Sequence, residues 1–310
     1  MGARIVQWCL VGLLRIIGAA LRFVPWRWYR SVGWALGRLW WWASPLRRRV
    51  AVENLQQAFP EHSHSWHVQV ARQCCTNAGI VLAEILSLAW LRAEELEERV
   101  RFLNPGLFAE CARRRRGLLL LSGHFGNWEW LACAAGLALR RLEIPVTVIV
   151  QRQANAAADH WLNRYRTRWG NRTVDLEHAA WALARALQRR EAVALLADQR
   201  AKPETALWLP FFGVVVPVHA MPAAVALRFR VPIILGFAFR QSDGTYVVPL
   251  EELPSEDLPD TPEGVRELTQ RYLQRLESVI RQRPELWLWQ HRRWKYVRPT
   301  ADASSVTPAP

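Results

Sequence analysis

Short apolar runs of strand type alternate with longer helical stretches from residue 118 onward, and this alternation limits the chain to one class of fold. The apolar runs cover residues 118–121, 146–150, 193–197, 232–239 and 246–249, and the helical stretches cover about 127–140, 155–169, 177–190, 218–230 and 262–282. Strands that alternate with helices of this length form a sheet with helices on its faces. The sequence therefore predicts an α/β fold, with a central mixed β-sheet flanked by helices.

The first 92 residues lack this alternation and have the pattern of helices alone. The expected helices cover about 3–23, 27–43, 46–58 and 64–92, and they are separated at Pro25, Ser44-Pro45 and Pro60-Glu61, because proline interrupts helices. Residues 299–310 form a low-complexity tail. We therefore expect three parts: N-terminal helices over 1–43, the α/β domain over 44–298 and a disordered tail over 299–310.

The N-terminal helices have the features of a membrane attachment. Residues 5–25 are mostly apolar but are interrupted by Arg15 and Arg22, and an arginine near a bilayer centre costs about 2.5–3.5 kcal/mol on insertion scales. Arg4 lies on the same helical stripe, and a basic stripe suits a helix in the interface plane at least as well as one that crosses. We expect residues 1–43 to associate with a membrane, by crossing it or by lying on it. The alternative is a helix that packs against the protein's own core.

Charge and composition favour a membrane partner over nucleic acid. The chain has 41 basic and 27 acidic residues, a net charge of +14 and a pI of about 10.8. Five of its 18 tryptophans cluster with arginines at residues 26–30 and 38–42, a combination suited to the headgroup layer of a membrane. No helix-turn-helix, zinc or RNA-binding pattern accompanies the charge. The five cysteines show no CxxC pair, so we expect reduced thiols and a chain that mostly faces the cytosol.

The clearest chemical signal is the segment LLLLSGHFGNWE at residues 118–129. A buried strand ends at Ser122-Gly123, His124 follows in the loop, and a helix begins near Asn127. Ligands of open α/β sheets bind beyond the carboxyl ends of strands, where His124 is expected. His124 and Glu129 would not share a helical face, since five residues span about 140° of turn. With His124 before the helix, however, the Glu129 carboxylate could turn back to the imidazole.

A histidine oriented by a carboxylate is suited to general-base catalysis. The carboxylate fixes the tautomer and raises the basicity of the free ring nitrogen, which can then take a proton from a hydroxyl. No nucleophile-elbow pattern surrounds His124, and this favours direct transfer without a covalent enzyme intermediate. A chance His–Glu spacing is the alternative interpretation of these two residues alone.

Several sequence blocks resemble those of the lipid A biosynthesis lauroyl/myristoyl acyltransferase family, the HX4E branch of the lysophospholipid-acyltransferase superfamily. The blocks are the His124-x4-Glu129 motif, ENL and AFPE at residues 53–61, ADQ at 197–199, PFFG at 210–213, and PELWLW with HRRWK at 284–295. The resemblance covers nearly the whole chain. It implies a glycerolipid-acyltransferase-like fold and transfer of a fatty acyl chain from acyl carrier protein to a hydroxyl of a lipid A precursor. It also implies the cytoplasmic face of the cell inner membrane, with the N-terminal helix as anchor.

The resemblance also assigns roles to residues. It makes His124 the general base and Glu129 its orienting partner, and it places Asn127, Arg152, Asp198, Gln199 and Phe212 at the substrate. Asp198 and Gln199 follow a strand whose end lies at the same sheet edge as His124. Asp198 could bind Arg152, and Arg152 an acceptor phosphate, or the two could form a plain ion pair. Phe212 could be a pocket wall or a packing corner.

Some positions depart from the family and leave the acceptor open. Gln151 replaces an aromatic residue, residues 155–158 read NAAA, and residues 214–222 lack the usual Thr and Gly. The acceptor could therefore be another lipid, such as a glycerolipid, ornithine lipid or glycolipid. We expect no cofactor and no metal site, because His62, His64 and His67 do not share one helix face and have no cysteine or carboxylate cluster beside them.

An acidic carrier protein would be attracted by an arginine-rich rim. Arg164, Arg166 and Arg168, together with Arg292 and Arg293, are the candidates for that rim. Lipid phosphates or water are alternative partners for them. The competing class of function is a basic membrane- or nucleic-acid-binding protein without enzymatic activity.

Overall fold

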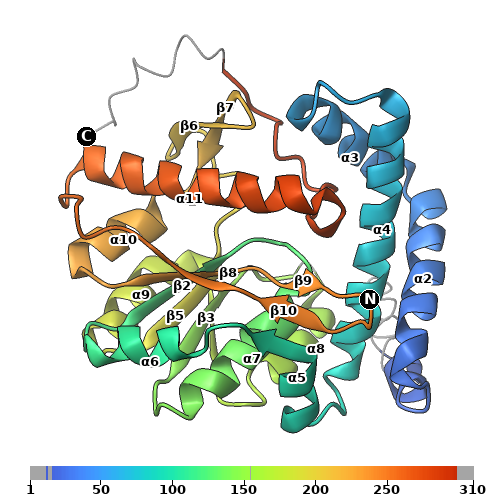
Figure 1. Ribbon diagram of the computed structural model, residues 1–310, viewed down its shortest axis with the longest axis horizontal. Helices are drawn as coiled ribbons and strands as arrows, with labels where there is room; N and C mark the ends of the chain where they lie inside the picture. The colour runs from blue at the N-terminus through green and yellow to red at the C-terminus, as the bar shows by residue number, and fades with distance from the viewer. Residues whose placement is uncertain (1–11, 13–15, 154, 299–310) are drawn as a thin grey trace.

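A six-stranded sheet forms the centre of the protein in the computed structural model, which describes residues 12, 16–153 and 155–298 (Figure 1). Its strand order is β11-β8-β2-β5-β3-β4, with β11 antiparallel to β8 and all other neighbours parallel. The strands are β2 (Leu118–Ser122), β3 (Val146–Val150), β4 (Arg172–Asp175), β5 (Ala192–Leu196), β8 (Ile233–Gly236) and β11 (Leu250–Leu253). The expected mixed sheet is confirmed.

Successive side chains of the central strand β2 enter two different cores. Leu119 and Leu121 pack into one buried cluster, and Leu118 and Leu120 pack into another, because side chains alternate between the faces of a strand. The first cluster is covered by α9 (Ala179–Gln188), α10 (Met221–Phe229) and α11 (Pro262–Gln282), and the second by α5 (Ala93–Arg99), α6 (Gly106–Arg113) and α7 (Trp128–Arg140). A strand buried on both faces reads as a continuous apolar run, which is why β2 was recognisable in the sequence.

Two smaller sheets and short helical turns complete the α/β part. One sheet has the order β1-β10-β9, and the other is the hairpin of β6 and β7. Their strands are β1 (Val100–Phe102), β9 (Phe239–Arg240), β10 (Tyr246–Val248), β6 (Leu207–Phe211) and β7 (Val214–Val218), and the remaining elements are α8 (Ala156–Arg166) and the turns η2 (Leu176–His178) and η3 (Pro284–Leu286). The expected single strand over 232–239 is wrong, because β8 and β9 belong to different sheets.

The N-terminal helices pack closely on the rest of the chain. They are η1 (Trp26–Trp28), α2 (Tyr29–Ala43), α3 (Pro45–Ala58) and α4 (His64–Ser87), so the fourth helix ends earlier than expected. The helices α2 and α4 run side by side at the edge of the molecule (Figure 1). Gly33 and Gly37 face Gly79 and Ile80, and a Cβ at Gly33 would lie 2.3 Å from Ile80 Cα. Only glycine allows the two helix backbones to approach this closely, so α2 packs directly against α4.

Most of the first expected helix, over residues 3–23, lies outside the described residues. Within its described part, residues 16–21 are helical. Within the part of the chain that the structure describes, no helix is both long and apolar enough to cross a membrane. The expected tail at 299–310 also lies outside the described residues. The boundary at residues 43 and 44 stays a prediction.

Candidate active site

Two adjacent parallel strands bring His124 and Asp198 together. The strands β2 and β5 pair in register, with Ser122 opposite Leu196, and His124 and Asp198 each follow two residues later. His124 Nδ1 lies 2.8 Å from Asp198 Oδ1, and the His124 backbone N–H donates to Asp198 Oδ2 at 2.8 Å. The prediction that both residues lie at one sheet edge is therefore confirmed. Their direct contact makes Asp198 the carboxylate partner of the imidazole.

Asp198 is held as a buried anion. Its side chain is 1% exposed, and Trp287 Nε1 donates a third hydrogen bond to it, at 2.8 Å from Oδ2. Burial alone would raise the pKa of this carboxyl, but the electrostatic attraction of the neighbouring His124 ring and the three hydrogen bonds lower the pKa to about 2. Hydrogen bonds to a carboxylate favour its charged form. An ionised Asp198 accepts a hydrogen bond from the His124 Nδ1–H, and this leaves Nε2 as the basic nitrogen.

The loop that carries His124 is fixed by the C-terminal segment. The Leu288 backbone N–H donates to His124 O at 3.0 Å, and the Gly126 N–H donates to Leu286 O at 2.9 Å. Gly126 has a φ of +60°, and a Cβ there would lie 1.9 Å from Ala238 O, so only glycine fits. The C-terminal segment in turn accepts hydrogen bonds from Asn54 at two backbone carbonyls. The separate sequence blocks therefore meet around one loop.

The side of the His124 ring away from Asp198 is partly exposed and faces Gln199. The His124 side chain is 20% exposed, and Gln199 Nε2 lies 3.2 Å from His124 Nε2. Trp128 meets the imidazole edge-on, with ring centroids 5.0 Å apart. The Gln199 amide lies where a hydrogen-bond donor can reach the basic nitrogen Nε2. Gln199 is thus placed as expected, next to the site.

Glu129 differs from its expected position. Its carboxylate forms a bidentate ion pair with Arg166, which donates from Nε at 2.8 Å and from Nη2. The two side chains are 7% and 10% exposed. The pair links the first turn of α7 to the last turn of α8, so the prediction that Glu129 turns back to the imidazole is wrong. The two charge-assisted hydrogen bonds from the buried Arg166 occupy the Glu129 carboxylate at the start of α7, so it does not turn toward His124.

Asn127 is buried within the protein rather than facing the substrate. It is 0% exposed, caps α7 by accepting a hydrogen bond from the Trp130 N–H at 3.0 Å, and donates to Glu84 Oε2 at 2.8 Å. Glu84 is also buried and pairs with Arg240 and with the Tyr246 hydroxyl. The expectation of a substrate contact by Asn127 is wrong, because this residue anchors the start of α7 to a buried polar network.

Arg152 lies elsewhere than expected, and Phe212 takes one of its two expected roles. Arg152 pairs with Asp175 at 2.7 Å and is 74% exposed, so its suggested contact with Asp198 is wrong. The β3–β4 pairing explains this, since Asp175 lies opposite Val150. Phe212 is 5% exposed and packs edge-on against Phe59. The packing-corner interpretation of Phe212 is the one that the structure favours.

The expected arginine rim is divided between surface and interior. Arg164, Arg168 and Arg292 are exposed, but Arg166 and Arg293 are buried. Arg293 is 1% exposed, donates to Pro217 O at 3.1 Å, and has its pKa lowered to about 10 by burial. A group that is buried cannot meet a carrier protein, so the rim is reduced to the three exposed side chains. The described residues contain no group of three or more metal-ligand side chains.

Sequence reasoning missed two residues that organise the site. Trp287 belongs to the C-terminal block that was recognised, but only the fold shows its hydrogen bond to Asp198. Arg166 is one of many arginines, and nothing in its neighbourhood along the chain marks it as the partner of a residue 37 positions away.

Comparison with known proteins identifies the family of the chain. The family model of bacterial lipid A biosynthesis acyltransferases matches residues 3–296. A lipid A biosynthesis lauroyltransferase from Escherichia coli (strain K12) is 22% identical over 292 residues, which cover 94% of this chain and 91% of that protein. Because the family match extends over nearly the whole chain, the protein belongs to the bacterial lipid A biosynthesis acyltransferase family.

Proposed function

We propose that this acyltransferase moves a fatty acyl chain from acyl carrier protein to a hydroxyl group of a lipid A precursor. The observation that carries the proposal is the His124–Asp198 pair, in which Nδ1 is held at 2.8 Å, while Nε2 faces the Gln199 amide at 3.2 Å on a ring that is 20% exposed. An imidazole held in this way can act first as a base and then as an acid. The family supplies the class of reaction.

The proposed reaction needs one proton acceptor and no covalent enzyme intermediate. His124 Nε2 takes the proton of the acceptor hydroxyl while its oxygen attacks the carbonyl carbon of the donor thioester. The tetrahedral adduct then loses the sulfur, the C–S bond breaks, and the proton passes from His124 to the departing thiolate. The products are an ester and a free thiol.

Asp198 is the positioning residue for this base. It fixes the tautomer and stabilises the imidazolium that forms during the attack. Glu129, in this proposal, acts at a distance, because its pair with Arg166 holds the start of α7 and the loop before it. The two residues of the HX4E motif thus act differently: His124 is the base, and Glu129 holds the loop that carries it.

Membrane attachment through residues 1–43 is part of the proposal. Among the large hydrophobic side chains exposed in the described part of the chain, seven lie between residues 16 and 46. They are Ile16, Phe23, Trp28, Trp34, Leu39, Trp42 and Leu46. Arginines stand among them, and Arg38 lies 4.7 Å from the Trp34 ring centroid. Aromatic rings with guanidinium groups suit the interface of a membrane, and we place the protein on the cytoplasmic face of the inner membrane.

The donor can be tested by ionic strength. An acidic carrier protein should be attracted by the exposed Arg164, Arg168 and Arg292, so its transfer rate should fall steeply as salt rises. The control is the same acyl chain on coenzyme A, compared in wild type and in Arg292→Ala. A carrier-protein rate insensitive to both salt and Arg292→Ala would contradict the proposed donor.

The acceptor is tested by mass spectrometry of lipid A and of phospholipids from cells with and without the protein. The proposal expects lipid A to lose one secondary acyl chain when the protein is absent, and to regain it with wild type but not with His124→Ala. Unchanged lipid A with an altered phospholipid, ornithine lipid or glycolipid would assign another acceptor. If no lipid changed, the protein would be a membrane-binding protein rather than this enzyme.

A further inference from the structure

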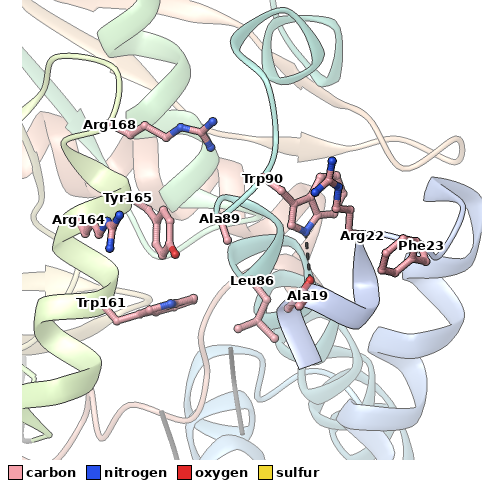
Figure 2. Close-up of a pocket in the computed structure, with 11 residues that line it drawn as sticks. Ala19, Arg22, Phe23, Leu86, Ala89, Trp90, Trp161, Arg164, Tyr165 and Arg168 are labelled. Atoms are coloured by element: carbon pink, nitrogen blue, oxygen red, sulfur yellow. Dashed lines mark hydrogen bonds between the residues drawn. The ribbon is translucent and has the colours of Figure 1, made fainter. Parts of the chain in front are cut away.

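A cleft of about 900 Å³ lies between α8, the end of α4 and the segment before η1. Figure 2 shows Trp161, Arg164 and Tyr165 on α8 and Arg168 just after it, opposite Ala19, Arg22 and Phe23. None of His124, Asp198 and Gln199 lines the cleft. Its volume is in the range of small-molecule sites.

The lining offers hydrogen-bond donors and positive charge without a balancing acid. Arg22, Arg164 and Arg168 line the cleft, and no Asp or Glu is among the described lining residues. Arg168 donates to Leu88 O at 2.9 Å, whereas the described lining holds no carboxylate that could neutralise Arg22 and Arg164. Unneutralised guanidinium groups that converge on one space favour an anion there.

A buried donor gives independent support. Trp161 is 6% exposed, and its indole Nε1 has no hydrogen-bond partner among the described residues. The other indole of the cleft is satisfied, because Trp90 Nε1 donates to Gly18 O at 3.1 Å. Buried polar groups are ordinarily hydrogen-bonded, so the unpartnered Trp161 N–H marks a place where an acceptor is missing.

Exposed apolar side chains surround the cleft, as expected for a site that binds a lipid. Phe23 is 85% exposed at one wall, and Ile16 on the same segment is 68% exposed. The remaining walls include Trp90, Trp161 and Tyr165. Sugar hydroxyls require acceptors as well as donors, and among the described lining side chains the Tyr165 hydroxyl is the single acceptor, with no carboxylate or amide beside it. A phosphodiester with an apolar tail fits this combination better than a sugar.

We propose that this cleft binds the phosphate of an anionic membrane phospholipid, at a site separate from the catalytic histidine. This inference rests on the proposed membrane attachment and not on the acyl acceptor. With Arg164 and Arg168 at the lipid, Arg292 is the member of the exposed rim that remains for the carrier protein. The bound lipid would hold α8 against the segment at residues 16–23, and α8 also carries Arg166, the partner of Glu129. The site would therefore connect membrane contact to the helix that supports the motif.

The test is binding of dihexanoyl phosphatidylglycerol, below its micelle concentration, to the full-length protein by calorimetry. The site variant is Arg22→Gln with Arg164→Gln, and the matched control is Arg113→Gln with Arg116→Gln, which removes the same charge from exposed positions near α6. We expect the site variant to bind about tenfold more weakly or worse, because each guanidinium contributes charge-assisted hydrogen bonds. The control should bind as wild type does. Trp161→Phe, which keeps a ring but removes the N–H, should also weaken binding.

Three comparison ligands identify the occupant. Inorganic phosphate, glucosamine 1-phosphate and dihexanoyl phosphatidylcholine should each bind at least about tenfold more weakly than phosphatidylglycerol, since they lack the tail or oppose the cationic walls. Equal binding of phosphate would make the cleft a free-anion site, and equal binding of the sugar phosphate would make it an acceptor site. Either result, or a site variant that binds normally, would overturn the proposal. His124→Ala should bind the lipid normally, so failure here and failure of the transferase are distinguishable.

Discussion

Replacing Glu129 by alanine should destabilise the protein rather than only disable its chemistry. The Glu129 and Arg166 side chains are 7% and 10% exposed, so the substitution leaves a guanidinium buried without its anion. Removing one partner of a buried ion pair costs about 3–5 kcal/mol. At about 2–4 °C per kcal/mol for large domains, the midpoint of thermal unfolding should fall by about 6–20 °C.

A double substitution separates this cost from a catalytic role. Glu129→Leu with Arg166→Met removes both charges, and replacing a buried pair by apolar groups is often nearly neutral. The double variant should therefore recover at least half of the midpoint lost by Glu129→Ala. The matched control is Glu97→Ala, which breaks the 2.6 Å pair with the 72% exposed Arg141 and should cost at most about 1 kcal/mol.

The assay combines calorimetric melting with transfer activity, measured at a temperature at which every variant is folded. A Glu129→Ala protein that melts like wild type and yet loses about 100-fold or more in transfer would refute this reasoning. It would restore Glu129 as the direct partner of His124.

Three further outcomes follow from the structure. Asp198→Asn should lower the transfer rate by about 10²–10⁴-fold, because it removes the anion that fixes the imidazole; a rate within a few-fold of wild type would contradict this. Trp34→Ala with Trp42→Ala should reduce sedimentation with anionic vesicles, whereas Trp181→Ala, at an equally exposed tryptophan on α9, should not; equal losses would remove the role of α2. Burial lowers the pKa of His291 from 6.5 to about 4, so the unfolded chain binds more protons in this range and the free energy of unfolding should fall as pH falls from about 6.5 to 4. His291→Gln should flatten that decline in urea titrations, and an unchanged pH dependence would contradict the assignment.

The sequence predicted the elements that follow from local pattern. β2 is buried on both faces, so its apolar run was unambiguous, and the turn at Gly123 after it placed His124 at the sheet edge. Asp198 could be placed at the same edge because parallel strands end together. Nothing in the sequence pattern singled out Gly33 and Gly37, although these two glycines set how closely α2 approaches α4.

The strand order was not predictable from local pattern, and the partner of His124 depends on it. β5 inserts between β2 and β3, which places Asp198 next to His124 and leaves Arg152 with Asp175 at the outer edge. The partner of Glu129 was equally hidden, because an ion pair between two helices depends on how α7 and α8 pack. Residues 207–218 were not recognised as a hairpin, since β6 and β7 contain Pro210 and Pro217, and proline argues against a strand.

The most direct test of the account is the rate of acyl transfer by purified His124→Ala, measured beside wild type with the same thioester donor and lipid A precursor. Loss of a general base typically costs 10²–10⁴-fold, about 3–5 kcal/mol of barrier. We predict a loss of this size for His124→Ala, in a protein that still folds and still binds phosphatidylglycerol. Near-normal turnover by His124→Ala would contradict the assignment of His124 as the base.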